Sequence, residues 1–514
     1  MSDKRSGVFV REATGLVKQV SLLDAISINI SDMSAGAALA VVGFTTILLP
    51  SMSGVNLVFA SLLAFTILIP QFIVYTMMTQ RMPRTGGDYV WVSRSLGGFA
   101  GNVSALCGYT VGNLPYASLI AMSSVFAIGA SGVALGYSNL LGLALPGNIT
   151  GADTTSQFIV ATLIVLVLVV INIVKPKAAY KMISAFTILG IITLVIANGV
   201  LLAGGRAGVA NYISSLGIQN TTYDTIASSY SGPFVDWGAT LGFVPYFALF
   251  TYPWVNAAPA LGSEIKGKST LRWNVPISAV VAMLLTTSAF ATMYYVGGFN
   301  FINGALANSN LVNNYSFNFW TLAMGVAGGN TVIAWIIGAG WVLWTVNILA
   351  YLIVVEARYL MAQAFDRFLP AKLASVNRQG SPYIAQLIDF VVIVIMIAGA
   401  SFFYGTFVSL YGTIVGPMLY FAVVGVAAVV YALRHETGRN KAVLAVCGVL
   451  SALAFLWLSF QLVYNYAIWG GNLFAYGFLV VTAAIASVIY FASKAYYHSK
   501  GIDITGAFKE IPPE

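Results

Sequence analysis

The sequence predicts an all-α membrane protein with twelve transmembrane helices, and composition and charge placement carry the prediction. Hydrophobic residues make up 59% of the 514 residues and charged residues only 8%, and the mean hydropathy is +0.86. A soluble chain of this length could not bury so much apolar surface. In addition, 23 of the 24 lysines and arginines fall into seven clusters, separated by roughly 50–90 residues.

The seven basic clusters predict the topology. They are Lys4, Arg5, Arg11 and Lys18; Arg81, Arg84 and Arg94; Lys175, Lys177 and Lys181; Lys266, Lys268 and Arg272; Arg358, Arg367, Lys372 and Arg378; Arg434, Arg439 and Lys441; Lys494, Lys500 and Lys509. Each interval holds two apolar spans of about 20 residues and an outer loop. Because basic loops stay cytoplasmic, we expect both termini inside. Only Arg206 departs from the pattern.

The net charge of +8 does not indicate nucleic-acid binding, because the cations are dispersed over loop ends. That distribution is typical of cytoplasmic loops that meet anionic membrane lipid. Two lone histidines, His435 and His498, and two cysteines in apolar stretches, Cys107 and Cys447, predict no metal site and no disulfide framework. No nucleophile or phosphate-binding motif is present, so we expect no enzyme and no cofactor.

The expected spans are long continuous apolar runs, which favours helices over the ten-residue alternation of barrel strands. They are 20–49, 54–79, 99–131, 155–174, 180–203, 236–262, 274–297, 329–363, 383–402, 404–431, 441–466 and 471–497. The outer loops at 132–154, 204–235 and 298–328 are rich in Asn, Ser, Gly and Tyr, and we expect them to be solvated.

Two of these helices are interrupted. The first carries Ser31-Asp-Met-Ser-Ala-Gly36 near its middle, and the sixth carries Thr251-Tyr-Pro-Trp254. Pro253 removes a backbone donor and clashes with the preceding turn. Non-helical backbone at membrane depth survives only when it is buried in protein or lines a watery cavity. A matched pair of interrupted helices indicates a transporter substrate site, although either break alone is also explained as a packing kink.

Three ordered motifs resemble the amino acid–polyamine–organocation transporters. Residues 81–97 read RMPRTGGDYVWVSRSLG and are similar to the family's Pro-x-x-Gly-Gly-x-Tyr signature. The run from Phe247 to Lys268 resembles its aromatic-rich break followed by Glu-Ile-Lys. The segment from Arg358 to Asp366, with Ser381-Pro382 beyond it, is similar to the end of the family's eighth helix.

The resemblance implies the leucine-transporter-like fold. Two inverted five-helix repeats would occupy 20–203 and 236–431, with two extra helices in 441–497 and cytoplasmic termini at 1–19 and 498–514. It also implies a secondary active transporter that moves amino acids across the plasma membrane by alternating access. We expect proton coupling, with Na⁺ as the alternative ion. An amino acid/polyamine exchanger is the alternative function, followed by a non-transporting sensor of the same fold.

The resemblance also implies the substrate-binding residues. In the family, free N–H groups of the first break receive the substrate carboxylate, and free carbonyls of the sixth helix receive the amine, as the helix dipole favours. Ser34, Ala35 and Gly36 stand at the first break in this chain. Phe250, Thr251 and Trp254 stand at the second, and Trp254 matches a gating aromatic. Where some relatives carry a lysine in the fifth helix, Gly190 stands here, so that coupling device is absent.

Two acidic residues are candidates for coupling or gating. Asp32 lies near mid-membrane, where a carboxylate costs roughly 2.5–3.5 kcal/mol. It is interpreted as a substrate contact or proton carrier. The alternatives are a cap for the outer half of the first helix and a static partner of Asn29 or of a polar group on another helix. Glu264 ends the sixth helix and is expected to form an inner-gate ion pair with a basic residue of the first loop or N-terminus.

Four other charged residues receive structural interpretations. Glu356 and Arg358 are expected to pair with each other at the inner end of the eighth helix. Asp24 and Asp389 lie near inner helix ends, where we expect water to reach them.

Overall fold

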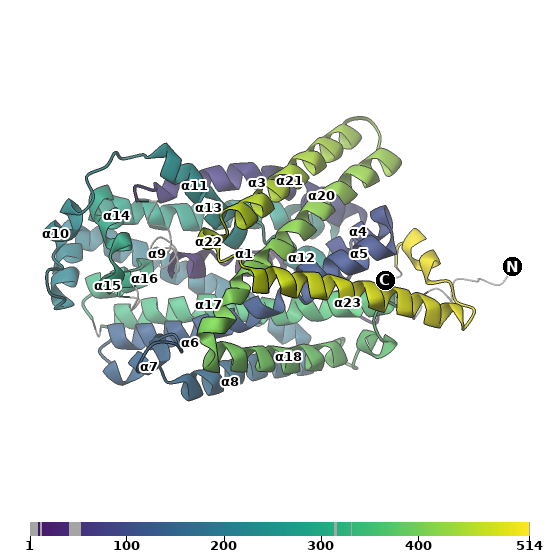
Figure 1. Ribbon diagram of the computed structural model, residues 1–514, viewed down its shortest axis with the longest axis horizontal. Coiled ribbons are helices and arrows are strands. Elements are labelled where there is room, and N and C mark those ends of the chain that lie inside the picture. The colour runs from purple at the N-terminus through teal and green to yellow at the C-terminus, as the bar shows by residue number, and fades with distance from the viewer. Residues whose placement is uncertain (1–8, 11–12, 41–52, 313–315, 330, 513–514) are drawn as a thin grey trace.

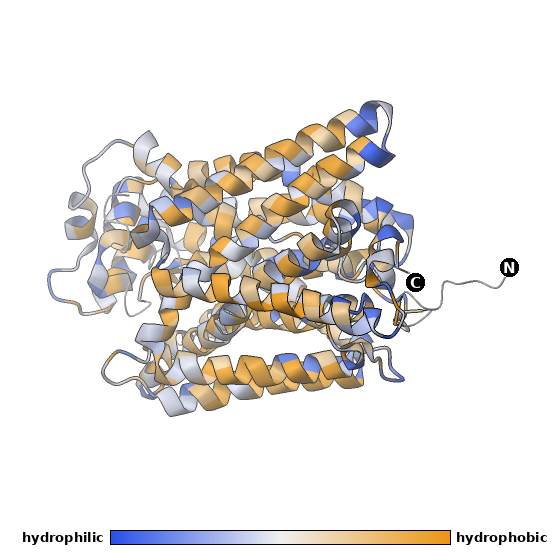
Figure 2. Cartoon of the chain, turned by 45° about the vertical axis from the view of Figure 1, so that its right-hand side comes forward, coloured by the Kyte–Doolittle hydropathy of each residue, from blue (hydrophilic) through white to orange (hydrophobic). Residues whose placement is uncertain are grey.

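The computed structural model describes residues 9–10, 13–40, 53–312, 316–329 and 331–512. Within these ranges the chain is helical and has no strand, only the isolated bridges Val20–Ile265 and Thr85–Leu261. The long helices run roughly parallel through the body of the molecule (Figure 1). Apolar residues dominate the middle of these helices and polar residues gather towards their ends (Figure 2), as a membrane-spanning bundle requires.

Ten helical stretches of the described chain are long and apolar enough to cross a membrane. They comprise α3 (Leu57–Arg81), α5–α6 (Gly98–Ala134), α8 (Thr154–Val174), α9 (Pro176–Ser215), α13 (Lys268–Gly297), α17 (Val332–Phe365), α18 (Tyr383–Phe402), α19–α20 (Tyr404–His435), α21 (Gly438–Tyr464) and α23 (Leu473–His498). All ten overlap expected spans, so the protein is a multi-pass membrane protein.

The two remaining expected spans are the interrupted ones. The first contains α1 (Leu22–Met33), a turn at Ser34 and renewed helix over 35–40, and its expected outer part, from 41, lies outside the described residues. The other contains α11 (Trp237–Phe250) and the four-residue α12 (Ala257–Ala260). The count of twelve membrane crossings stays a prediction.

Shorter elements connect and cover the long helices. They are α4 (Asp88–Leu96), the π-helix η3 (Leu106–Thr110) within α5–α6, η4 (Ser138–Leu140), α7 (Leu141–Ala144), α10 (Tyr223–Ser228), η5 (Gly262–Glu264), α14 (Phe299–Ala307), α15 (Ser309–Val312), α16 (Phe319–Val326), η6 (Ala371–Ala374), α22 (Tyr466–Trp469) and η8 (Ile504–Lys509). The stretch Tyr404–His435 contains three elements, α19 (Tyr404–Phe407), η7 (Val408–Ile414) and α20 (Val415–His435), which follow one another without a loop.

Helix starts follow local capping chemistry. Ser21 and Asp24 form a reciprocal capping box at the start of α1, and such a pair satisfies two otherwise free N–H groups. Asn56, Asp153 and Asp236 accept N–H bonds at the starts of α3, α8 and α11. These caps explain why the observed starts lie within three residues of the expected ones.

The described parts of the seven basic segments meet at one end of the molecule. We call it the terminal end because Phe9 and Pro512, near the two ends of the described chain, contact Arg367 and Arg84 there, and the C-terminus lies on this side (Figure 1). Contacts between segments are Lys266 N–Val20 O, Lys181–Asp24, Asn377–Ile173 O, Arg367–Phe9 O, Arg81–Glu436, Arg434–Ser95 O and Arg84–Pro512 O. The chain therefore returns to the same end between successive pairs of helices, as the charge pattern predicts.

The prediction of a solvated loop at 298–328 is wrong for much of its length, because the segment is largely helical and buried. Phe301, Phe319 and Trp320 are buried, and the Trp320 indole N–H donates to Gly36 O at 2.8 Å. The apolar residues of α14 and α16 thus form a cap that reaches the break in the first helix. The loop expected at 204–235 also begins later, because α9 continues past a kink at Gly205.

Candidate functional site

A cavity of about 250 Å³ has both helix breaks in its wall. Its wall is predominantly apolar and aromatic, with a few polar groups. Ligand pockets usually measure about 300–1,000 Å³ and combine an apolar wall with a few placed polar groups. The cavity is therefore suited to one small molecule.

The first break is a left-handed turn at Ser34, with φ 47° and ψ 39°. Its N–H donates to Ile30 O at 3.1 Å and so ends α1, and Ala38 N then bonds to Ser34 O at 3.0 Å as the helix resumes. The first turn of a helix has N–H groups without intrahelical partners. The renewed helix therefore presents a positive dipole end beside the cavity.

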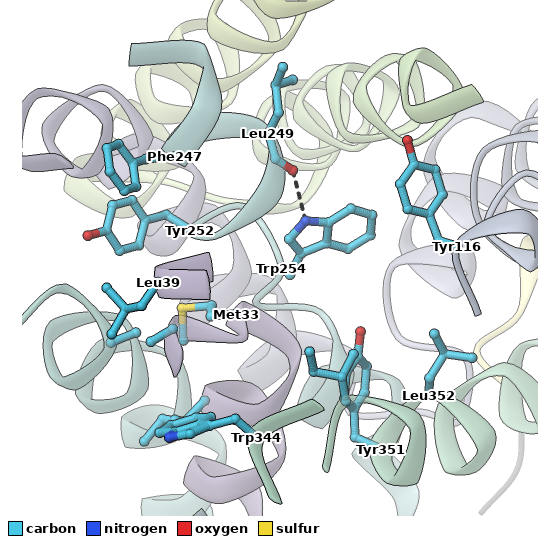
Figure 3. Close-up of a cluster of buried hydrophobic side chains, with 14 of the residues drawn as sticks. Met33, Leu39, Tyr116, Phe247, Leu249, Tyr252, Trp254, Trp344, Tyr351 and Leu352 are labelled. Carbon is cyan, nitrogen blue, oxygen red and sulfur yellow. Dashed lines mark hydrogen bonds between the residues drawn. The ribbon is translucent and has the colours of Figure 1, made fainter. Parts of the chain in front are cut away.

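The second break spans residues 251–256, between α11 and α12. Gln71 of α3 donates to Pro253 O at 2.8 Å, and the Trp254 indole N–H donates to Leu249 O at 2.9 Å. Trp254 packs edge-on against Phe421, with ring centroids 5.6 Å apart. Figure 3 shows Trp254 turned towards Tyr116 and Tyr351, whereas Tyr252 turns the other way, towards Phe247.

Four of the predicted site residues line the cavity: Asp32, Ser34, Phe250 and Trp254. The other three, Ala35, Gly36 and Thr251, belong to the same breaks but are not part of its wall. Ala35 and Thr251 are fully buried. Gly36 is covered by Trp344, whose ring atoms lie 2.3 Å from where a Cβ would stand.

Asp32 sits in the last turn of α1 with its carboxyl group buried. Neither oxygen accepts a hydrogen bond of normal geometry from a described residue. The groups that act on this carboxyl include the Tyr351 hydroxyl and the Ala257 N–H at the start of α12. The helix-cap interpretation is therefore wrong here. The Asn29 partnership is wrong as well, since Asn29 bonds instead to Asn274 and to Ala258 N. A static partnership with a polar group on another helix stays open, because the Tyr351 hydroxyl belongs to α17.

The sequence did not identify most of the cavity wall. Tyr116 of α6, Thr345 and Tyr351 of α17, and Trp469 of α22 all contribute. These residues lie on helices far apart in the chain, and aromatic residues at helical spacing are common in any apolar core. No local motif marks them.

Trp344 does not line the cavity but joins three helices. Its indole lies between Gly36 beyond α1 and Gly190 of α9, where an added Cβ would come within 2.9 Å of the ring. The indole N–H donates to Gly190 O at 3.1 Å. Gly190 therefore has no room for the lysine that some relatives carry there.

A buried ion pair closes the terminal end below the cavity. Arg358 of α17 donates from Nε to Glu264 Oε1 at 3.0 Å, and both side chains are fully buried. The Tyr180 hydroxyl of α9 donates to the other carboxylate oxygen at 2.5 Å. The expected ion pair of Glu264 exists, but its expected partner was wrong: the cation comes from helix α17 and not from the first loop or N-terminus.

The Gly-Gly motif allows the α3–α4 loop to approach α12 closely. A Cβ on Gly87, whose φ is +42°, would lie 2.8 Å from Ala260 N. The Gly86 N–H donates to Ala260 O at 2.9 Å. A larger residue at position 87 would therefore push the loop away from the α12 end of the break, whereas a Cβ on Gly86 would lie 2.6 Å from Ala362 Cβ of α17.

The motif at the end of α17, from Arg358 to Asp366, packs against the α3–α4 loop and α4 at the terminal end. Asp88, which follows the two glycines, accepts hydrogen bonds from the hydroxyls of Tyr75, Tyr359 and Tyr420 at 2.5–2.6 Å. Asp366 pairs with Arg94 and accepts a bond from Tyr89 at 2.7 Å. The three ordered motifs thus meet in space, and they join α4, α12 and α17.

Three charged residues differ from expectation. Glu356 does not pair with Arg358, which binds Glu264. Asp24 and Asp389 are buried rather than reached by water. Asp24 is held by Lys181 at 2.9 Å and by the Ser184 hydroxyl at 2.7 Å, whereas the Asp389 carboxyl touches that of Glu356.

Comparison with known proteins gives a family and one curated relative. A family model described as amino acid permease matches residues 20–491. An 82-residue segment, 16% of this chain, is 32% identical to "Uncharacterized protein 399" of Sulfolobus islandicus rod-shaped virus 1. The match spans 20% of that protein, so it carries no inference about activity.

Proposed function

Since the chain belongs to the amino acid permease family, we propose that it is a secondary active transporter that moves amino acids across the plasma membrane by alternating access. The observation that carries the proposal is the cavity with both helix breaks in its wall. Paired breaks supply free N–H groups at one helix end and free carbonyls at the other, which suits a molecule with a carboxylate and an amine.

The terminal end of the structure supports alternating access. Below the cavity, Glu264–Arg358 and Asp366–Arg94 are buried ion pairs that join different helices. For substrate to leave on this side, these contacts must separate. The basic segments gathered at this end support its assignment to the cytoplasm, because cationic loops stay inside.

We further propose that a proton drives the transport and that Asp32 carries it. A buried carboxyl in the cavity wall, with no described cation beside it, is most stable when neutral. An ionised Asp32 would also repel a substrate carboxylate at the neighbouring Ser34 turn. A protonated Asp32 admits the substrate, and loss of the proton then favours its release.

Uptake into proteoliposomes tests the proposal. Purified protein is assayed against labelled amino acids and amines under an imposed pH gradient, an imposed Na⁺ gradient or no gradient. We expect accumulation of an amino acid with the pH gradient alone. Counterflow without accumulation under either gradient would favour the exchanger. The absence of both, with intact folded protein, would favour the sensor.

A further inference from the structure

A second buried acidic group lies behind the cavity wall, between α17 and α18. The carboxyl groups of Glu356 and Asp389 are in direct contact, and both side chains are at least 97% buried. Both Glu356 oxygens and Asp389 Oδ2 accept no hydrogen bond of normal geometry from a described residue. Two ionised carboxylates in contact, without a donor between them, repel each other strongly in a low-dielectric interior.

No described cation offsets this charge. Arg358, two residues along α17, is taken up by Glu264, Tyr180 and Val354 O. Lys372 of η6 is exposed. The α8 helix, which packs against both α17 and α18, has no titratable residue, and α6 has only Tyr116. The other titratable groups on this side are Tyr351 and Tyr359 of α17, Tyr109 of η3, Asp32 of α1 and Asp88 of α4.

An independent observation links the pair to the cavity. Tyr109 lies in the π-helix η3, a helix irregularity that is common at functional sites. Its hydroxyl is fully buried and has no hydrogen-bond partner of normal geometry among the described residues. It interacts electrostatically with Asp32, Glu356 and Asp88, and the Asn256 side chain also acts on its hydroxyl. Asn113, which acts on the Glu356 carboxyl, also lines the cavity.

We propose that the Glu356–Asp389 pair is a proton-binding site that holds one proton between its two carboxyl groups, and that Tyr109 passes this proton to and from Asp32. The bound proton makes one carboxyl a donor to the other, so the pair carries one negative charge instead of two. Before transfer the Tyr109 hydroxyl, which has no hydrogen-bond partner of normal geometry among the described residues, must come within hydrogen-bond distance of the pair and of Asp32. The O–H bond of the pair then breaks as the Tyr109 oxygen takes its proton. The former hydroxyl proton forms a new O–H bond on Asp32, and the tyrosine stays neutral.

The pair would therefore be a reservoir for the coupling proton, outside the substrate cavity. The relay to Asp32 rests on the proposed proton coupling, whereas protonation of the pair does not. The two parts need separate measurements.

Infrared spectroscopy of the purified full-length protein tests the pair without any transport. A protonated carboxyl has a C=O stretching band distinct from the carboxylate bands, and the band shifts in D₂O. We expect the band at neutral pH to lose the intensity of one carboxyl group in the double variant Glu356→Gln/Asp389→Asn. The amide pair keeps the shape and can hydrogen-bond internally, so the fold should persist, and thermal unfolding checks this.

Asp153→Asn is the matched control. Asp153 is an exposed cap of α8, where the hydroxyl and N–H of Ser156 lower its pKa. Its carboxyl is therefore ionised at neutral pH, and its removal should leave the band unchanged. An unchanged band in folded Glu356→Gln/Asp389→Asn would overturn the proton site. So would a wild-type band that gains one carboxyl's intensity when Na⁺ is replaced by choline, because the pair would then bind Na⁺.

Tyr109→Phe tests the relay. Phenylalanine keeps the stacking on Tyr359, whose ring centroid is 4.3 Å away, and removes only the hydroxyl. We expect the infrared band to remain, proton-driven accumulation to slow at least tenfold, and counterflow to continue at the wild-type rate. Accumulation at the wild-type rate would overturn the relay. A wild-type protein that moves no amino acid would refute the proposed function and with it the relay, while the infrared result for the pair would still stand.

Discussion

Arg358 and Glu264 form a fully buried ion pair between α17 and η5, the short helix that follows the second break. Breaking a buried pair leaves a charge without compensation, which costs about 3–5 kcal/mol. We therefore expect Arg358→Ala to lower the thermal unfolding midpoint strongly, as measured in detergent. Arg81→Ala is the control, because the Arg81–Glu436 pair is partly exposed and such pairs contribute about 0–1 kcal/mol. Equal unfolding midpoints for the two variants would contradict the conclusion that the Arg358–Glu264 pair holds the terminal end together.

Trp254 lines the cavity, and its indole N–H is bound to Leu249 O. We expect Trp254→Ala to reduce uptake per folded molecule at least tenfold, or about 1.4 kcal/mol in the transport barrier, because the aromatic wall over the substrate is lost. Trp273→Ala, at a partly exposed position on α13, should transport normally. If Trp254→Ala is destabilised yet transports like the wild type, the residue only supports packing.

Gly87 has both a positive φ and a close neighbour, so Gly87→Ala carries two penalties. Left-handed backbone costs a non-glycine residue about 1–2 kcal/mol, and overpacking adds about 1–3 kcal/mol. Gly136→Ala isolates the first penalty, since Gly136 also has a positive φ but nothing within 4 Å of its Cβ position. The fall in the unfolding midpoint should be clearly larger for Gly87→Ala. A fall no larger than that of Gly136→Ala would show that α12 moves aside for the added methyl group at little cost in stability.

Sidedness can be tested with single cysteines in a background without Cys107 and Cys447. Ser214, Ser309 and Ser269 are all exposed, so accessibility alone does not distinguish them. We expect Ser214→Cys and Ser309→Cys to react with an impermeant thiol reagent added to intact cells. Ser269→Cys should react only after the membrane is opened. Labelling of position 269 in intact cells would refute the predicted orientation.

Asp32→Asn mimics the protonated carboxyl permanently. If Asp32 carries the driving proton, accumulation under a pH gradient should vanish, while substrate binding and counterflow persist. If Asp32 instead binds the substrate ammonium, binding itself should weaken, because charge-assisted hydrogen bonds are roughly twice as strong as neutral ones. Wild-type accumulation in this variant would end the proton-carrier hypothesis.

Hydropathy and charge placement were sufficient to predict the ten long helical stretches of the described chain and their common basic end, because both properties are local. The breaks at Ser34 and Pro253 were also predictable, since each depends on a few adjacent residues. Side-chain partners were not. Glu356 and Arg358 are two residues apart on a helix with 3.6 residues per turn, so they point to different sides. Glu264 and Asp389 then become their partners through helix packing that no local pattern records.

The buried loop helices were missed for a related reason. The region 298–328 is rich in Asn, Ser and Gly, which suggest solvent, but Phe301, Phe319 and Trp320 provide an apolar face. A short amphipathic segment between two membrane spans gives little hydropathy signal. The cavity residues Tyr116 and Tyr351 could not be separated from core aromatics without the fold.

The position of Trp344 between two glycines has a consequence for the family's sequence variation. A side chain at position 36 or 190 would occupy the space of the indole, so the three positions should covary. Homologues that carry a lysine or another larger residue at position 190 should have a smaller residue than tryptophan at position 344. The prediction fails if, in an alignment of permeases, tryptophan at position 344 is as frequent beside a large residue at position 190 as it is beside glycine. That result would show that α9 and α17 move apart to make room for the side chain.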